Sequence, residues 1–169
     1  MRGGANQRRN SGPREKPEYE QKIIDIRRVA RVVSGGRRFS FRVSVVAGNR
    51  KGEVGVGLGK AGETVTAIEK AYSAALKNKI KVPMTKNFSI PQAVQVKYAS
   101  SKLIMKPSPR GGIVAGSSVK SVLELAGIRD VNAKILSRSK NKLNNARAAI
   151  MALKKLKPLK AKFIKENKE

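Results

Sequence analysis

Residues 32–41 constrain the fold of this chain more than any other stretch. They hold the turn Ser34-Gly35-Gly36, then two arginines, then alternating apolar and polar residues. Glycine adopts positive φ without a Cβ penalty, as hairpin turns require. Alternation with a period of two is typical of a half-buried strand. The stretch therefore predicts a β-hairpin with a rigid, positively charged tip, which is suited to contact with a polyanion.

The hairpin extends into a larger pattern of three antiparallel strands and one helix. We expect strands over residues 22–33, 38–47 and 53–60, and a helix over 64–78. The helix is expected to cover the Phe/Val face of the second strand with an apolar stripe of Val65, Ile68, Tyr72 and Leu76. The opposite face would stay open and carry the polar residues of the second strand together with Gly55, Gly57 and Gly59 of the third. A glycine face lets a ligand or another backbone come close.

A second unit follows a basic linker over residues 79–88. Its pattern predicts a hairpin at 93–105, a Pro/Gly-rich ordered loop at 106–116 and a strand at 131–136. A helix capped by Ser117 or Ser118 should end at Gly127, and Asn141 or its neighbour should open a last helix. The fold class is α+β. Its expected parts are a disordered basic arm (1–20), a first domain (21–87), a second α+β domain (88–157) and a Lys-rich tail (158–169).

The charge of the chain indicates its ligand. The chain has 38 Lys and Arg against 11 Asp and Glu, a formal charge of +27. Such an excess is the electrostatic signature of a nucleic-acid binder. There is no Cys and no His, and the carboxylates are scattered singly, which leaves no pattern for a metal site or an acid/base pair. We therefore expect no enzyme, no cofactor and no metal.

One apparent cofactor motif does not hold. Residues 57–62 read G-x-G-x-x-G after a strand and before a helix. A dinucleotide site also needs a βαβ unit and an acidic residue about 20 positions further on. The strands here are joined by short turns, and no acid occurs between Glu69 and Glu124.

Arginine clusters are the strongest functional signal, because six of them fall within sixteen residues. A guanidinium group matches phosphate with a planar fork. Because Phe39 and Phe41 should face the core, the backbone and grooves of folded RNA are a better target than stacked single strands. The expected RNA-binding residues are Arg27, Arg28, Arg31, Ser34, Gly35, Gly36, Arg37, Arg38, Arg42, Lys51, Gly57, Gly59 and Lys60.

The segments 27–41 and 54–61 together closely resemble the N-terminal signature of small-subunit ribosomal protein five of the bacterial type, and residues 106–107, 111–116 and 122–127 are similar to its second domain. The resemblance implies a double-stranded-RNA-binding-like first domain and a second α+β domain with a split β-α-β core. It implies small-subunit rRNA as ligand and ribosomal proteins four and eight as neighbours. It also implies a place near the decoding region and the mRNA entry, with roles in assembly and translational accuracy.

The resemblance places the contact with protein four at Arg110, Gly111, Gly112 and Lys120. The chain departs from the family at Ser34, where a basic residue is usual, and in a shortened loop at residues 109–112.

The alternative to a ribosomal protein is a free-standing nucleic-acid chaperone or nucleoid-type protein. We expect a cytoplasmic ribosome rather than an organellar one, because Glu15, Glu18 and Glu20 are unlike a transit peptide.

Overall fold

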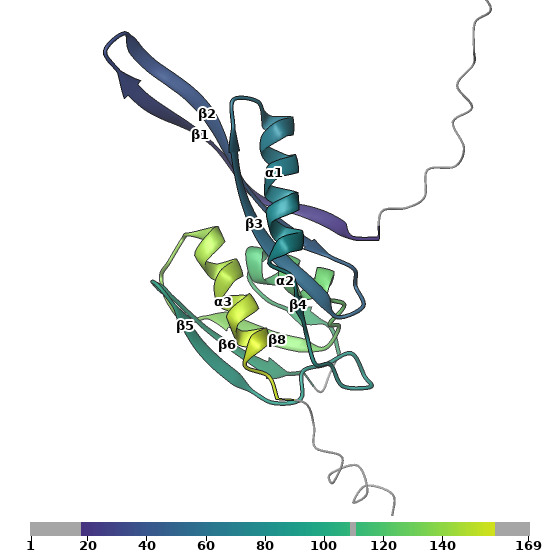
Figure 1. The fold of residues 1–169 in the computed structure, drawn as a ribbon. Helices are drawn as coiled ribbons and strands as arrows, with labels where there is room; N and C mark the ends of the chain where they lie inside the picture. Colours follow the sequence, from purple (N-terminus) through teal and green to yellow (C-terminus); the bar gives the residue numbers. More distant parts are fainter. Residues whose placement is uncertain (1–17, 109–110, 158–169) are drawn as a thin grey trace, which may run out of the picture.

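A computed structural model describes residues 18–108 and 111–157 and confirms the α+β class, with two four-stranded sheets and three helices in that part of the chain (Figure 1). The elements in order are β1 (Glu20–Val33), β2 (Gly36–Gly48), β3 (Glu53–Ala61), α1 (Thr64–Lys77), β4 (Ile80–Lys81), β5 (Val94–Tyr98), β6 (Ser101–Pro107), β7 (Ile113–Val114), α2 (Ser117–Ala126), β8 (Val131–Ile135) and α3 (Lys142–Lys154). The strand order is β1-β2-β3-β4 in the first sheet and β5-β6-β8-β7 in the second.

The β1–β2 hairpin has a tight turn and extends beyond its sheet. Val33 pairs with Gly36, so only Ser34 and Gly35 form the turn. Gly36 has a φ of 122°, a conformation that a side chain would strain. Strand β2 pairs with β3 only from Phe41 to Gly48. Residues 29–40 therefore form a two-stranded ribbon with no third strand, named the ribbon below.

The glycines of β3 face helix α1, and the expectation that they lie open beside the arginines is wrong. In the antiparallel register Gly55, Gly57 and Gly59 stand opposite Ala47, Val45 and Val43. They therefore share the face covered by α1. A Cβ built on Gly57 would overlap the carbonyl oxygen of Ala71. Here the glycines admit the backbone of a helix, not a ligand.

Because the backbones of α1 and β3 lie so close together, the buried residues of α1 differ from those expected. The buried side chains of α1 are Ala67, Ala71 and Ala75. The expected stripe is wrong, because Val65 is 64% exposed and its fellow members are only partly buried. When two backbones lie this close, alanine is the side chain that fits between them.

The second sheet contains a parallel pair that sequence patterning missed. Strand β7 lies inside the expected loop and runs parallel to β8, with α2 as the connection between them. Strand β4, which pairs with Glu53 and Val54, lies inside the expected linker. The hairpin of β5 and β6 is confirmed.

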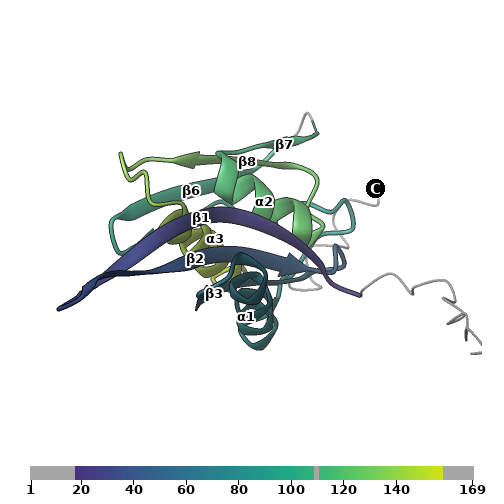
Figure 2. The same cartoon turned by 90° about the horizontal axis from the view of Figure 1, so that it is seen from above.

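Helices α2 and α3 lie between the two sheets, so the molecule has four layers with α1 on the outside (Figure 2). One core includes Val46 and Val56 of the first sheet and Val122 of α2. The turn after β2 is also hydrogen-bonded to the end of α2: the Arg50 N–H donates to the Leu125 carbonyl at 2.9 Å. The hairpin therefore projects from a body in which both units are joined.

Two helix ends of the second unit agree with the expected signals, but α2 begins after Gly116 without a side-chain cap, so the expected cap by Ser117 or Ser118 is wrong. Gly127 ends α2 with a φ of 85°, and Asn141 caps α3 by accepting hydrogen bonds from the N–H groups of Leu143 and Asn144. Helix α1 begins after Glu63 without a side-chain cap.

Candidate nucleic-acid interface

The ribbon is exposed on both faces because neither α1 nor the second unit extends along it (Figure 1). All of its arginines are exposed, and so are the three residues of the expected turn. Val32 is 75% exposed. Phe39 is 49% exposed, so the expectation that it faces the core is wrong.

Strand register divides the cations between two faces. Arg31 stands opposite Arg38, Arg27 opposite Arg42, and Arg42 opposite Lys60. These five cations therefore share one face, named the arginine face. Arg28 and Arg37 lie on the other face, which carries Phe39 and Phe41 and continues under α1. The register thus gathers cations that the sequence separates by up to 33 positions.

Of the cations on the two faces of the ribbon and its base, only Arg27 is neutralised by a carboxylate within the described chain. The Arg27 Nε donates to the Asp25 Oδ2 at 2.7 Å. The guanidinium of Arg28 stacks on the ring of Phe39, 3.6 Å from its centroid. The remaining cations have no carboxylate within 4.0 Å among the described residues: Arg31, Arg37, Arg38, Arg42 and Lys60. Such a concentration of charge on a thin ribbon favours binding of a polyanion.

Three of the expected residues are not part of this surface. Gly57 and Gly59 are buried beneath α1. Lys51 is exposed, but it follows β2 at the end of the sheet away from the turn at Ser34. The structure therefore concentrates the candidate interface on the ribbon, its base and Lys60.

The expected protein-contact residues lie on the second unit. Gly111 and Gly112 have positive φ, and the Gly112 N–H donates to the Asp130 Oδ1 at 2.8 Å. Lys120 is exposed on α2, with its Nζ 4.0 Å from the Glu124 carboxylate. Arg110 lies outside the described residues. Loop geometry is thus fixed by a carboxylate anchor that the sequence alone did not reveal.

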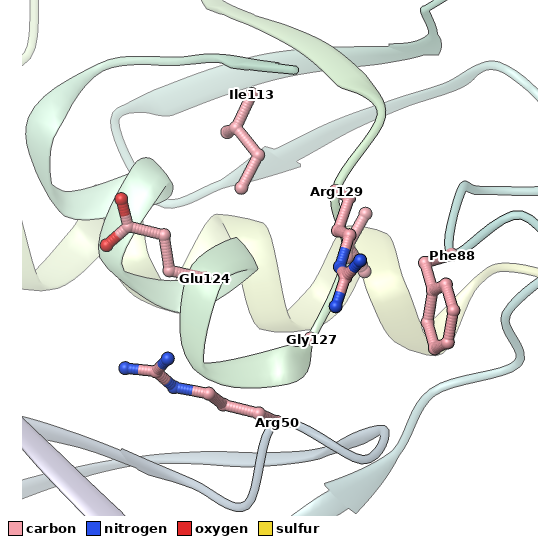
Figure 3. A pocket seen from close by; sticks show the side chains of 7 residues that line it. Arg50, Phe88, Ile113, Glu124, Gly127 and Arg129 are labelled. Atoms are coloured by element: carbon pink, nitrogen blue, oxygen red, sulfur yellow. The ribbon is translucent and has the colours of Figure 1, made fainter. Parts of the chain in front are cut away.

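A hollow of about 510 Å³ opens near this loop, at the junction of the two units (Figure 3). Arg50 from the first unit and Phe88, Glu124 and Arg129 from the second contribute to its wall. The Arg129 guanidinium lies 5.0 Å from the Phe88 ring centroid. Its mixed charge differs from the ribbon, where cations prevail.

A hydrogen-bonded cluster that the sequence did not predict holds the start of β1. The Tyr19 hydroxyl donates to the Glu53 carboxylate at 2.6 Å and accepts from the Lys79 Nζ at 2.8 Å. Hydrogen bonds from Tyr19 and Lys79 lower the pKa of Glu53, and those to Tyr19 and Glu53 raise the pKa of Lys79. Only the fold brings these three residues together, since Tyr19 and Lys79 are 60 positions apart.

Within the described residues, no three His, Cys, Asp or Glu side chains gather as a metal site, and no helix is long and apolar enough to cross a membrane. What the structure does present is an exposed cationic ribbon on a two-sheet body. Fold and surface together define an α+β protein whose exposed cations are suited to bind a polyanion such as a nucleic acid.

The chain belongs to the ribosomal protein S5 family. The family's N-terminal domain matches residues 19–83, and its C-terminal domain matches residues 96–166. The family that the sequence resembles is therefore confirmed. Because its members are ribosomal proteins, the interpretation as a structural protein rather than an enzyme is confirmed as well.

Curated relatives match along most of their length. Small ribosomal subunit protein uS5c of Rhodomonas salina is 47% identical over 155 residues, which cover 90% of this chain and 92% of the relative. The uS5c protein of Cyanophora paradoxa is 46% identical over 155 residues, covering 90% and 91%. The uS5 protein of Trichormus variabilis is 45% identical over 151 residues, covering 89% and 86%.

Proposed function

We propose that this protein is a structural constituent of the small ribosomal subunit and that its ribbon holds small-subunit rRNA. One observation carries the assignment of the site: six cations of the ribbon and its base have no carboxylate within 4.0 Å among the described residues. The names of its relatives support the assignment to the small subunit. Unpaired cations on an exposed hairpin are costly to a folded chain unless a polyanion neutralises them.

The distribution of charge suggests how rRNA is held. Cations occupy both faces of the ribbon, so the ribbon is suited to lie between two RNA segments and bind phosphates on each side. Arginine binds phosphate through two parallel hydrogen bonds, which fixes orientation as well as affinity. With about six phosphate contacts, affinity would fall about 10³-fold between 50 and 200 mM salt.

The second unit, in this proposal, docks on neighbouring ribosomal proteins. The loop with Gly111 and Gly112 and the exposed Lys120 of α2 would face protein four, as the family resemblance implies. The hollow with Arg50, Phe88 and Glu124 has the mixed polar and apolar character of a protein contact. Protein eight would be a further neighbour. The resemblance also supports a position near the decoding region and the mRNA entry, where the protein would serve assembly and accuracy.

Within this assignment, we propose that the ribosome is a cytoplasmic one. The relatives named above include both plastid and cyanobacterial proteins.

Sedimentation tests the proposal. In a sucrose gradient at moderate salt, the full chain is expected to migrate with small subunits. The double variant Arg37→Ala/Arg38→Ala should shift toward the free fractions while keeping its unfolding temperature. The matched control Lys97→Ala/Lys102→Ala removes two exposed lysines from the second sheet and should stay with the subunits. A wild-type chain that runs free of small subunits would contradict the proposal.

A further inference from the structure

A second basic surface lies away from the ribbon, in a groove between the end of α1 and helix α3. The groove has a volume of about 530 Å³. It forms because β4 pairs only with Glu53 and Val54 of β3, so the next part of β3 lies beside the groove without a fourth strand among the described residues. Its lining contains four cations and no carboxylate, with Val56, Ile80 and Ile150 as apolar residues. The cations are Lys77, Lys79, Arg147 and Lys154.

Three of these four cations lack a carboxylate partner. Lys79 is neutralised, since its Nζ lies 3.2 Å from the Glu53 carboxylate. Lys77, Arg147 and Lys154 have no carboxylate within 4.0 Å in the described ranges. The Arg147 Nη1 is 3.3 Å from the neutral hydroxyl of Tyr98, which holds the side chain without cancelling its charge.

Helix termini account for only part of this charge. Lys77 and Lys154 stand in the last turns of α1 and α3, where a cation offsets the partial negative charge of a helix end. The C-terminal end of each helix carries a partial negative charge of about half an elementary charge, so the two ends offset only part of the positive charge of the three cations. Arg147 is in the first half of α3 and has no such role. Since seven residues separate Arg147 from Lys154, they lie on one side of α3, roughly 10 Å apart along its axis.

We propose that this groove binds the phosphate backbone of rRNA, as a second RNA contact separate from the ribbon. The inference rests on the proposed function. Because Lys77 comes from the first unit and Arg147 and Lys154 from the second, a bound RNA strand would join the two units through its phosphates. Within the described lining Asn78 is the one uncharged polar side chain, and the floor is apolar, so the contact depends mainly on charge and position rather than on sequence.

Salt dependence of rRNA binding by the full chain tests the inference. The groove variant is Lys77→Gln/Arg147→Gln/Lys154→Gln. The control variant, Lys97→Gln/Lys102→Gln/Lys134→Gln, removes the same charge from exposed positions of the second sheet. Each lost phosphate contact lowers the slope of log affinity against log salt by about 0.7–0.9. Between 50 and 200 mM salt, wild-type affinity should therefore fall roughly 20- to 40-fold more than that of the groove variant.

Each outcome bears on one of the two proposals. A reduced slope in the groove variant with a wild-type slope in the control supports the groove as an RNA contact. Equal effects in both variants would overturn it, because net charge alone would then explain the loss. If the groove variant binds isolated rRNA normally but enters small subunits poorly, the groove binds an acidic protein surface instead. If wild type itself does not bind small-subunit rRNA, the proposed function fails first, and this inference falls with it.

Discussion

Substitution of Gly57 by alanine should damage the fold although it adds only one methyl group. The new Cβ would overlap the Ala71 carbonyl and lie 3.0 Å from the Ala75 Cα. Ordinary contact begins near 3.4 Å, so α1 would have to move by roughly 1 Å. Overpacking of this kind costs about 1–3 kcal/mol. For a chain of this size, that corresponds to a fall in Tm of about 2–12 °C.

Gly35→Ala provides the matched control. Gly35 is exposed, and a Cβ there meets no atom within 4 Å. Its stability should therefore stay within about 0.5 kcal/mol of wild type. Thermal and urea unfolding followed by circular dichroism would compare both variants. Equal stability of Gly57→Ala and Gly35→Ala would refute the close packing of α1 on the glycines of β3.

Two further substitutions test the buried and charged contacts. Glu53→Gln should destabilise the protein at neutral pH, because the lowered pKa of Glu53 stabilises the fold above its unfolded value of 4.5. That difference should disappear as pH falls below 4.5 through the folded pKa, and a constant difference in Tm down to pH 2 would contradict this reasoning. Asn145→Ala should cost about 1–3 kcal/mol in urea unfolding, because it leaves the buried Ser101 hydroxyl without its 2.7 Å partner. Asn144→Ala, at a half-buried neighbour, should be nearly neutral, and equal effects of the two would speak against the buried bond.

Local signals in the sequence predicted much of the fold. The alternation in β2 predicted which residues share a face, since Val43 and Val45 are buried under α1. The expectation that the opposite face stays open is wrong at Ser44 and Val46, which are buried. Gly127 and Asn141 marked helix ends through backbone and side-chain chemistry that acts within a few residues. Such features need no knowledge of distant partners.

Register explains the main error. The sequence predicted correctly which residues of β3 share a face. Which of these two faces lies on the same side of the sheet as the arginines of β2 depends on the β2–β3 register, and a shift of one residue at the turn 48–52 would exchange them. Gly48 pairs with Val54, which places Gly57 beside Val45 and Leu58 beside Ser44. A slip of one residue would reverse this arrangement, and composition does not reveal it. The alanine stripe of α1 follows from the same register, because only the paired structure shows where the backbones meet.

The groove cations were also beyond the reach of local patterns. Lys77, Arg147 and Lys154 are spread over 78 positions and resemble ordinary solvated charges in the sequence. They lie together only because α3 packs between the sheets, beside the edge of β3. The sequence indicated only that Arg147 and Lys154, seven positions apart, would lie on one side of a helix. That spacing does not predict a groove unless Lys77 is known to line it as well.

The most direct test of the central claim uses the absence of cysteine from this chain. Ser34→Cys creates a unique attachment point for an iron chelate at the exposed tip of the ribbon. After assembly into small subunits, hydroxyl radicals generated there should cleave small-subunit rRNA strongly at a few neighbouring segments. Cleavage no stronger than that seen with the cysteine-free chain would contradict the claim that the ribbon lies against rRNA.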